Sequence, residues 1–284
     1  MRQSCRYGDL RYLCTLIIRI MNRQVEAAIA FLRHVVRAKS KYRIHSPFVY
    51  SFYNNVLQNG HVYAQYRVVN RQRKELETVS RFIKRKDLGA HCKDFPCDQR
   101  FVRVSDIARH SAISRKKGEL IFRLVKWLNP SAILELGTSL GISTMYFSLA
   151  SPDSRVVTIE GCIDSANIAR ENFDKTGLKN IQVITGEFGD KLSAALEHIQ
   201  APDIVFFDGN HRKEPTLAYF EQCLQHIHPG TVFIFDDIHW SAGMVEAWDT
   251  ICRNDRVKVT IDLFHLGIVF FKDELSKEDF IIRF

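Results

Sequence analysis

From Gly118 onward, short apolar runs alternate with segments of helical spacing, and this alternation limits the possible folds more than any other feature of the sequence. Helices are predicted near residues 142–150, 163–176, 190–199, 215–226 and 242–254. The predicted strands are Ala132–Leu136, Arg155–Ile159, Ile181–Thr185, Ile204–Phe207, Thr231–Phe235, Val257–Leu263 and Gly267–Phe271. Strands and helices that alternate in this way require right-handed crossovers and a parallel sheet covered by helices on both faces.

The last two predicted strands lie too close in sequence for a crossover helix, so they must pair antiparallel, as a hairpin at one end of the sheet. The sequence therefore predicts an α/β fold. Its core is a doubly wound, Rossmann-like, seven-stranded and mostly parallel sheet with an antiparallel last strand, preceded by a helical N-terminal region.

The N-terminal region carries helical patterns without strands between them. Residues 21–38 are predicted to form an amphipathic helix, and Pro47 is well placed to open another helix after Ser46. The highly charged segment Gln65–Lys86 is also predicted to be helical, and residues 86–100 to form a loop. The apolar positions of the first helix are Val25, Ile29, Leu32 and Val36.

Charge divides the chain at nearly the same point as the patterns do. Residues 1–130 hold 27 Lys and Arg against 9 Asp and Glu, a net +18, whereas residues 131–284 hold 13 against 23, a net −10. We predict a helical, basic N-terminal region of residues 1–110, able to cap the active site, and an α/β domain of residues 111–284. The basic surface is either solvated, which we favour, or bound to nucleic acid, a phosphorylated substrate or an anionic membrane.

Cysteine usage and hydropathy favour the cytoplasm. The 7 cysteines show no regular framework, which is typical of a reducing compartment. The most apolar N-terminal run, residues 10–20, is interrupted by Arg11 and Arg19, so we expect neither a membrane span nor a secretory signal. Cys92 and Cys97, with His91 beside them, suggest a metal only weakly, because a second cysteine pair is missing.

Glycines and an acid follow the first two strands, where an open parallel sheet binds its ligands. Gly137 and Gly141 allow a sharp turn and a close approach of the backbone to a ligand, and the next helix directs its free N–H groups at the same space. The second strand ends in Glu160, where a carboxylate can accept hydrogen bonds from both hydroxyls of a ribose. Because Ser139 occupies the middle glycine position of the dinucleotide fingerprint, a nicotinamide cofactor is disfavoured.

Several motifs together resemble a known family. Glu135-x-Gly137-x-x-x-Gly141-x-Ser143 and Thr158-Ile-Glu160 resemble the first two motifs of class I S-adenosylmethionine-dependent methyltransferases, particularly the catechol and caffeoyl-coenzyme A O-methyltransferases. The resemblance covers about residues 111–271. It continues through Lys117-Gly118, Gly186-Glu187-Phe188, Asp203 to His211, and Gly230 to Asp237.

The resemblance implies how S-adenosylmethionine is bound. Gly137, Thr138 and Ser143 would hold its methionine end, Glu160 would bind the ribose, and Phe188 would flank the adenine, although a core aromatic is an equal alternative for that ring. The full set of implied cofactor residues is Glu135, which would orient the first loop, Gly137, Thr138, Gly141, Ser143, Glu160, Gly186, Glu187, Phe188 and Asp208.

Acidic residues follow the fourth and fifth strands. Asp208 and the pair Asp236 and Asp237 should converge at one edge of the pocket, because we expect the two strands to be neighbours. Three carboxylates that close repel one another unless protons or a cation offset them, and oxygen ligands suit Mg²⁺, Mn²⁺ or Ca²⁺. The catechol-type enzymes carry aspartates after the same strands, with an asparagine where Asp237 stands. One aspartate could instead bind the cofactor, with the others capping helices.

Histidines supply the candidate bases. His211 stands three residues after Asp208, where the related enzymes carry a lysine that removes the hydroxyl proton, and a histidine titrates near neutrality. His239 is the second candidate, and the neighbouring Trp240 could line the acceptor pocket. His45 could close over the site from the N-terminal region. We therefore assign catalysis to His211, Asp208 and His239.

Three functions are compatible with these features. The first is O-methylation of a small hydroxylated metabolite, assisted by a divalent metal, by a protein that could form a homodimer. The second is methylation of RNA, suggested by the basic N-terminal region; the sequence Asp208-Gly209-Asn210-His211 argues against amine targets, which usually require an Asn/Asp-Pro-Pro-aromatic loop. The third is a non-catalytic module that binds the cofactor or a partner.

Overall fold

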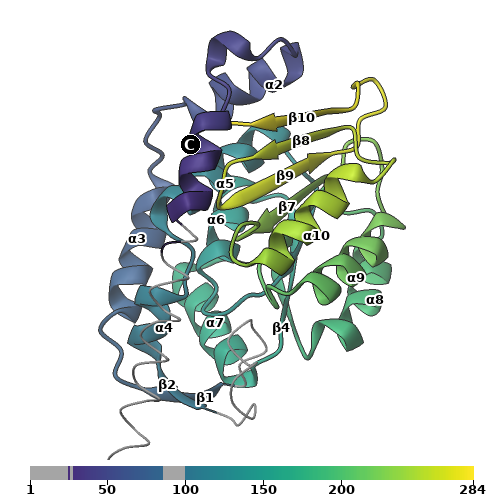
Figure 1. The fold of residues 1–284 in the computed structure, drawn as a ribbon. Helices are drawn as coiled ribbons and strands as arrows, with labels where there is room; N and C mark the ends of the chain where they lie inside the picture. The colour runs from purple at the N-terminus through teal and green to yellow at the C-terminus, as the bar shows by residue number, and fades with distance from the viewer. Residues whose placement is uncertain (1–24, 26–27, 86–99) are drawn as a thin grey trace, which may run out of the picture.

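The computed structural model describes residues 25, 28–85 and 100–284. A central β-sheet runs through the molecule (Figure 1). It has 8 strands in the order β10-β8-β9-β7-β6-β3-β4-β5. The strands are β3 (Ala132–Leu136), β4 (Arg155–Glu160), β5 (Ile181–Thr185), β6 (Ile204–Phe207), β7 (Val232–Asp236), β8 (Val259–Asp262), β9 (Leu266–Phe270) and β10 (Glu278–Ile281). The predicted doubly wound α/β fold is confirmed.

The pairing of the last strands both confirms and corrects the prediction. Strand β9 lies between β7 and β8 and is antiparallel to both, which confirms the hairpin. The prediction of seven strands was wrong, because β10 adds an eighth, parallel to β8, at the edge of the sheet. Its sequence, Glu-Asp-Phe-Ile, is too short and too acidic to stand out as a buried strand.

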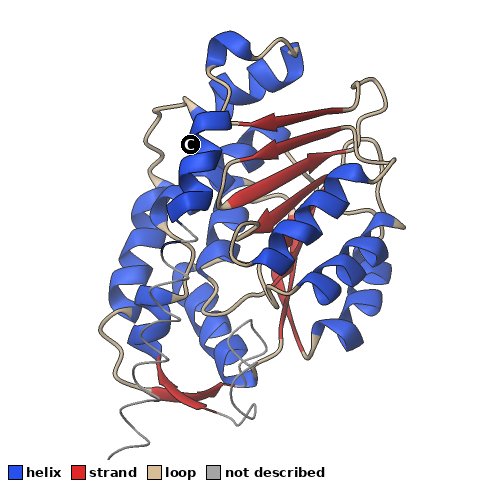
Figure 2. Cartoon of the chain, viewed as in Figure 1, coloured by secondary structure: helices blue, strands red, loops and turns tan. Residues whose placement is uncertain are grey.

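Each face of the sheet has its own apolar core, because successive strand residues point to opposite faces. Ile133 and Val156 pack with one set of helices, and Leu134 and Val157 pack with the other. The first set is α5 (Arg115–Leu128), α6 (Ile142–Ala150) and α7 (Ile163–Thr176). The second set, on the opposite face (Figures 1 and 2), is α8 (Phe188–Ile199), α9 (Lys213–Leu224) and α10 (Ala242–Arg253).

The described part of the N-terminal region is largely helical, as predicted, with one exception. Ser46 caps the helix that begins at Pro47, and its Oγ accepts a hydrogen bond from the Val49 N–H at 3.4 Å. The helix predicted over Gln65–Lys86 ends at Leu76, because β-branched and aromatic residues follow and pair as a strand. The elements after the helix at 28–37 are η1 (Lys41–Arg43), α2 (Pro47–Phe52), η2 (Tyr53–Leu57), α3 (Gln65–Leu76), β1 (Phe82–Arg85), antiparallel β2 (Arg100–Arg103) and α4 (Val104–His110).

The N-terminal helices share the core of the α5 face. Val49, Phe52 and Val69 are fully buried in the same apolar cluster as Ile133 and other strand residues. Buried polar contacts add to this packing: Arg123 Nε donates to the Val56 carbonyl at 2.6 Å. The division of the chain at residue 111 stays a prediction, and the apolar core is continuous across it.

The helix at residues 28–37 presents its apolar stripe outward. Ile29, Leu32 and Val36 are exposed, whereas His34 is buried. Within residues 25, 28–85 and 100–284, no helix is both long enough and apolar enough to cross a bilayer. The weak metal motif at His91, Cys92 and Cys97 lies outside the described residues.

We expect the N-terminal helices and the sheet to unfold together. Phe52→Ala removes a fully buried ring that packs within 6.2 Å of the Phe270 ring, between centroids. It should lower the free energy of unfolding by about 3–5 kcal/mol in one transition. Denaturant unfolding followed by circular dichroism and tryptophan fluorescence measures this. Exposed Tyr50→Ala is the control, and a separate transition that Phe52→Ala leaves unchanged would contradict shared folding.

Candidate active site

The turn after β3 lies where the strand order reverses, since β3 pairs with β4 on one side and β6 on the other. Gly137 and Gly141 adopt φ angles of 113° and 84°, which favour glycine. A Cβ atom at Gly137 would lie 2.1 Å from the Asp208 carbonyl oxygen. Only glycine therefore allows the loops after β3 and β6 to approach this closely.

Glu135 is a buried acid with one oxygen left open. Its Oε2 accepts hydrogen bonds from Thr144 Oγ1 at 2.5 Å and Thr158 Oγ1 at 2.7 Å. Its Oε1 is buried without a hydrogen-bond partner. Burial raises the pKa of Glu135 to about 7, although the hydrogen bonds from the two threonines oppose the rise. This open oxygen can accept a hydrogen bond from a ligand's ammonium group.

Glu160 braces the same turn from the end of β4. Its two oxygens accept the backbone N–H groups of Ser139 at 2.7 Å and Cys162 at 2.8 Å. Each oxygen keeps a further lone pair for a hydroxyl. Thr138 differs from expectation in one respect: its hydroxyl bonds to Thr158 Oγ1 at 2.6 Å inside the protein. Its side chain is thus engaged internally, and so is its backbone: the Thr138 N–H donates to the Ile159 carbonyl at 3.3 Å, and the Thr138 carbonyl accepts the Gly141 N–H at 2.8 Å. A contact of Thr138 with a cofactor stays a prediction.

The loop after β5 brings Phe188 to the loop after β6. Gly186 has a φ of 146°, and its N–H donates to the Glu160 carbonyl at 2.9 Å. Glu187 is the N-cap residue of α8. The Phe188 ring packs on the backbone of Gly209, where an added Cβ would lie 2.6 Å from the ring. These residues lie beside the turn, as the sequence predicts, and their contacts with a cofactor stay predictions.

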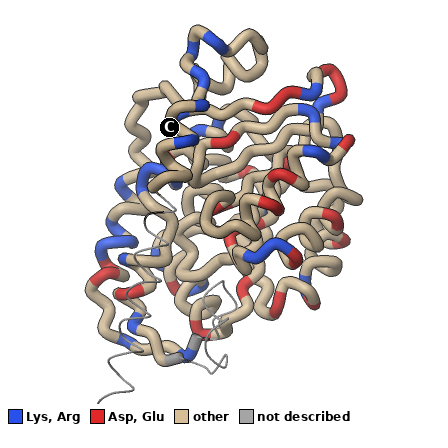
Figure 3. The backbone as a smooth tube through the Cα atoms, in the orientation of Figure 1, with Lys and Arg blue, Asp and Glu red and all other residues tan. Residues whose placement is uncertain are grey.

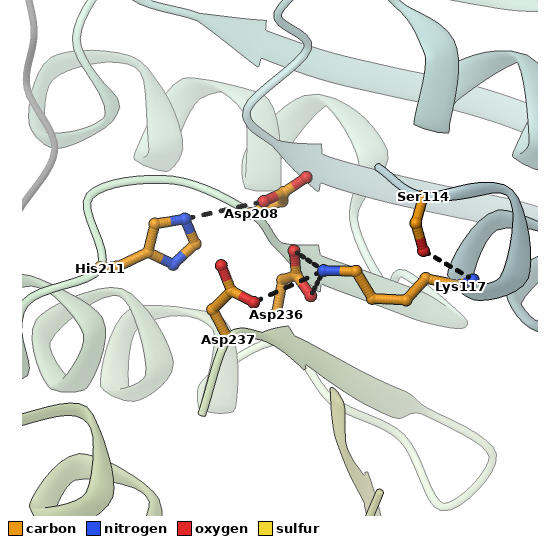
Figure 4. A network of polar contacts seen from close by, with 6 residues as sticks. All are labelled: Ser114, Lys117, Asp208, His211, Asp236 and Asp237. Carbon is orange, nitrogen blue, oxygen red and sulfur yellow. Dashed lines mark hydrogen bonds and ion pairs between the residues drawn. The ribbon is translucent and has the colours of Figure 1, made fainter. Parts of the chain in front are cut away.

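The acidic residues at the ends of β6 and β7 face a partly buried lysine, Lys117 (Figure 4). Lys117 Nζ, near the start of α5, lies 2.6 Å from Asp236 Oδ1, 2.7 Å from Asp236 Oδ2 and 3.5 Å from Asp237 Oδ1. Ser114 begins this helix as its N-cap, with its Oγ accepting the Lys117 N–H at 3.3 Å. We call Asp208, Asp236 and Asp237 the acidic cluster.

The cluster holds more negative charge than its surroundings offset. Burial, and then the charge of Asp236, raise the pKa of Asp208 well above its usual range. Burial and Asp237 likewise raise the pKa of Asp236, although Lys117 opposes them. Burial alone would lower the pKa of Lys117, but the carboxylates outweigh it and raise that pKa. Lys117 thus stays a cation and partly compensates the carboxylates.

The acidic cluster does not fit a metal as it is arranged here. The Lys117 ammonium contacts both oxygens of Asp236. Across the described ranges, no group of three or more His, Cys, Asp or Glu side chains is placed to hold a metal ion. An ammonium therefore supplies the positive charge for which the sequence suggested a divalent cation, and metal binding stays a prediction.

The candidate histidines separate in space. His211 points at the acidic cluster, with its Nε2 3.8 Å from Asp208 Oδ1 (Figure 4). His239 bonds instead to Asp262 at the end of β8, with 2.8 Å between its Nε2 and Oδ2. His45 and Trp240 are exposed, and neither of them nor His211 lines the cavity beside Lys117 and Asp237. The structure thus brings only His211 of these residues to the acidic cluster.

Two residues of this region escaped the sequence analysis. Lys117 appeared only as part of a family motif, and a lysine on an exposed-looking helix start gives no signal of an ion pair with Asp236, 119 residues away. His34 lies on the N-terminal helix, contacts Asp262 and lines the same cavity as Lys117. In the sequence, only the position of His34 opposite the apolar stripe of that helix could have suggested that its side chain is buried.

Comparison with known proteins agrees with this geometry. A methyltransferase domain model matches residues 134–238. Catechol O-methyltransferase of Sus scrofa is 32% identical over 133 residues, which cover 44% of this chain and 70% of that protein. Catechol O-methyltransferase B of Danio rerio is 33% identical over 176 residues, covering 60% of this chain and 65% of that one.

Solved structures share the fold. The SAH-bound methyltransferase PaMTH1 of Podospora anserina aligns with a TM-score of 0.58 at 15% identity, over 81% of this chain and 97% of that chain. The SAH complex of a Bacillus cereus O-methyltransferase aligns with a TM-score of 0.51 at 23% identity, over 78% and 97%.

The fold and the turn after β3 thus define a class I methyltransferase domain. The chain belongs, more narrowly, to the catechol O-methyltransferase family within that class. It spans about three fifths of the length of the first catechol O-methyltransferases it matches, 58% and 62% of those proteins.

Glu135→Gln tests whether the buried carboxyl of Glu135 makes the free energy of unfolding depend on pH. Because folding raises the pKa of Glu135 from 4.5 to about 7, the folded state binds its proton more tightly. The stabilisation is complete below pH 4.5 and is lost as the pH rises through 7, by about 3 kcal/mol in all. Urea unfolding between pH 4 and 8 should show this component in the wild type and not in the variant. Equal pH dependence in both proteins would contradict the assignment.

Lys117→Met tests the metal prediction. Without the ammonium, the carboxylates of the acidic cluster would attract a divalent cation more strongly, so Mg²⁺ affinity should rise at least about tenfold. Calorimetric titration measures the affinity, with the exposed Lys126→Met on the same helix as control. If neither wild type nor Lys117→Met binds Mg²⁺, the metal prediction fails.

Proposed function

We propose that the protein transfers the methyl group of S-adenosylmethionine to a hydroxyl of a small acceptor. The observation that carries this proposal is the shared edge of the sheet. There the open Oε1 of buried Glu135 and the close approach of Gly137 to Asp208 lie at the carboxyl ends of adjacent strands. The family of the chain supports the same activity, and its catechol O-methyltransferase relatives favour oxygen as the acceptor atom.

The residues around the β3 turn fit the cofactor's methionine end. The open oxygen of Glu135 would accept the ammonium of that end, while the N-terminus of α6 favours its carboxylate. Glu160 would accept the ribose hydroxyls on its free lone pairs. Phe188, packed over Gly209, would offer a ring face to the adenine. When bound, S-adenosylmethionine supplies an electrophilic methyl group on a sulfonium sulfur.

The acidic cluster would prepare the acceptor. His211, 3.8 Å from Asp208, would take the hydroxyl proton on a ring nitrogen, and Asp208 would stabilise the imidazolium that forms. The acceptor oxygen would then form a bond to the methyl carbon while the carbon–sulfur bond breaks. The electron pair of the broken bond would remain on sulfur. The Lys117 ammonium, 2.6 Å from Asp236 Oδ1, would stabilise the developing oxyanion. No step is assigned to a metal.

We also propose a cellular compartment and a partner for the protein. We place it in the cytoplasm, because the described thiols of Cys162, Cys223 and Cys252 are free. A small hydroxylated acceptor is the proposed partner, and a homodimer stays a prediction.

RNA is the second candidate acceptor. Basic residues gather along α3, including exposed Arg67, Arg71 and Lys74, away from the acidic helices α8, α9 and α10 (Figure 3). Such a stripe could follow a phosphate backbone, with binding that weakens steeply as salt rises. A solvated surface explains the same residues, so the small acceptor is preferred.

Methyl transfer should be measurable directly. Purified protein incubated with S-adenosylmethionine and a library of small phenols and alcohols should release S-adenosylhomocysteine, detected by mass spectrometry. His211→Ala should lower the turnover of the best acceptor about 10²–10⁴-fold near neutral pH, because the proton then has no positioned base.

The matched control is exposed His110→Ala, which should be as active as the wild type. Total cellular RNA in a parallel reaction separates the second candidate from the first. Calorimetry that finds neither S-adenosylmethionine nor S-adenosylhomocysteine bound would leave the non-catalytic partner-binding module as the remaining function.

A further inference from the structure

A cavity of about 320 Å³ opens beside the acidic cluster and shares Lys117 and Asp237 with it. This volume is within the range of small-molecule sites. Most of the wall surface is apolar, although Lys116, His265 and Arg283 also line it. The wall comes from the N-terminal helix, the start of α5, the turn between β8 and β9, and the C-terminal segment. The apolar lining residues are Phe31, Val35, Leu263, Phe264, Leu266 and Phe284.

His34 is the buried polar residue of this wall. Only 6% of its surface is exposed, and its ring packs edge-on against Phe264 with 5.4 Å between centroids. His34 Nε2 lies 3.2 Å from Asp262 Oδ1 and 3.2 Å from the Asp262 carbonyl oxygen. The N-terminal helix is therefore held to the end of β8 by a side chain that also borders the cavity.

Asp262 is fixed as a carboxylate. Its Oδ1 also accepts the Phe264 N–H at 2.7 Å, and its Oδ2 accepts His239 Nε2 at 2.8 Å. Burial alone would raise the pKa of Asp262, but hydrogen bonds from His239 and His34 outweigh it and hold that pKa well below its usual range. Both oxygens that face His34 Nε2 thus only accept hydrogen bonds, so Nε2 must carry the proton.

The other ring nitrogen of His34 is left open. In a neutral imidazole whose Nε2 carries the proton, Nδ1 is an acceptor. His34 Nδ1 is buried and has no hydrogen-bond partner. A buried polar atom without a partner is costly, and in a native protein it calls for an explanation such as strain, a functional role, or a bound water or ion. A ligand in the cavity that donates a hydrogen bond would complete it.

We propose that the cavity is the acceptor site and that His34 Nδ1 accepts a hydrogen bond from a second donor group of the acceptor. This inference rests on the proposed function. It specifies the acceptor as a small, mostly apolar compound with two polar ends. The reacting hydroxyl lies at Lys117 and Asp237, and a separate hydroxyl or N–H group lies at His34, across the apolar wall.

Two matched probes test this assignment. 4-(Hydroxymethyl)phenol carries a donor across the ring from its phenol, and 4-ethylphenol has nearly the same shape with a methyl group in place of that donor. Calorimetric titration of the wild-type chain should give about tenfold tighter binding of the first probe, the usual effect of one buried hydrogen bond. His34→Phe keeps an aromatic ring and removes the acceptor, so it should lose the preference for the first probe. His45→Phe, outside the cavity, should keep the preference.

If His34 has only a structural role, the result is different. His34→Phe would then weaken the binding of both probes by the same factor, or it would leave the preference for the first probe intact. Either result overturns the proposal, as does a wild type that binds neither probe or shows no preference. If His34→Phe does not fold, nitrogen-15 NMR of histidine-labelled wild type decides. We expect a proton on Nε2 and none on Nδ1, and a proton on Nδ1, in either the opposite tautomer or the imidazolium, overturns the proposal. These experiments measure binding, whereas the proposed function is tested by turnover. Failure of the acceptor-site proposal can therefore be distinguished from failure of the proposed methyl transfer.

Discussion

The place of β3 between β4 and β6 is the constraint on which the rest of the structure depends. Parallel pairing on both sides directs the loops after these strands to one edge of the sheet. The Gly137 backbone then lies so close to the Asp208 carbonyl that a side chain is excluded. Cofactor turn and acidic cluster are therefore parts of one rigid arrangement, whose distances are set by backbone pairing rather than by flexible side chains.

The site also depends on charge compensation between the Lys117 ammonium and the carboxylates of the acidic cluster. Burial raises the pKa of both Asp208 and Asp236, and a neighbouring carboxylate raises each further, Asp236 for the first and Asp237 for the second. Lys117 reaches them from α5, which packs on one face of the sheet before β3 begins. One ammonium beside several carboxylates leaves the site electronegative, so it favours a cationic ligand such as a sulfonium. The same ammonium can stabilise an oxyanion next to it.

The N-terminal region contributes more than a cover. Its helices fill the core on the α5 face, and its helix at residues 28–37 supplies Phe31 and His34 to the cavity wall. Because His34 is tied to Asp262 at the end of β8, the geometry of the proposed acceptor site depends on how this helix docks. Folding of the N-terminal region and recognition of the acceptor are thereby linked.

The sequence by itself determined the alternation of strands and helices, the glycine turn, Glu160 and the aspartates, because these depend on local period, backbone freedom and strand ends. It missed β10, whose apolar content is small, and the strand β1, hidden in a charged segment. Tertiary structure alone decided that Lys117 meets Asp236, that His239 turns to Asp262, and that His34 rather than His45 borders the cavity. Those choices depend on how helices dock on the sheet, and docking brings together residues whose separation in sequence carries no pattern.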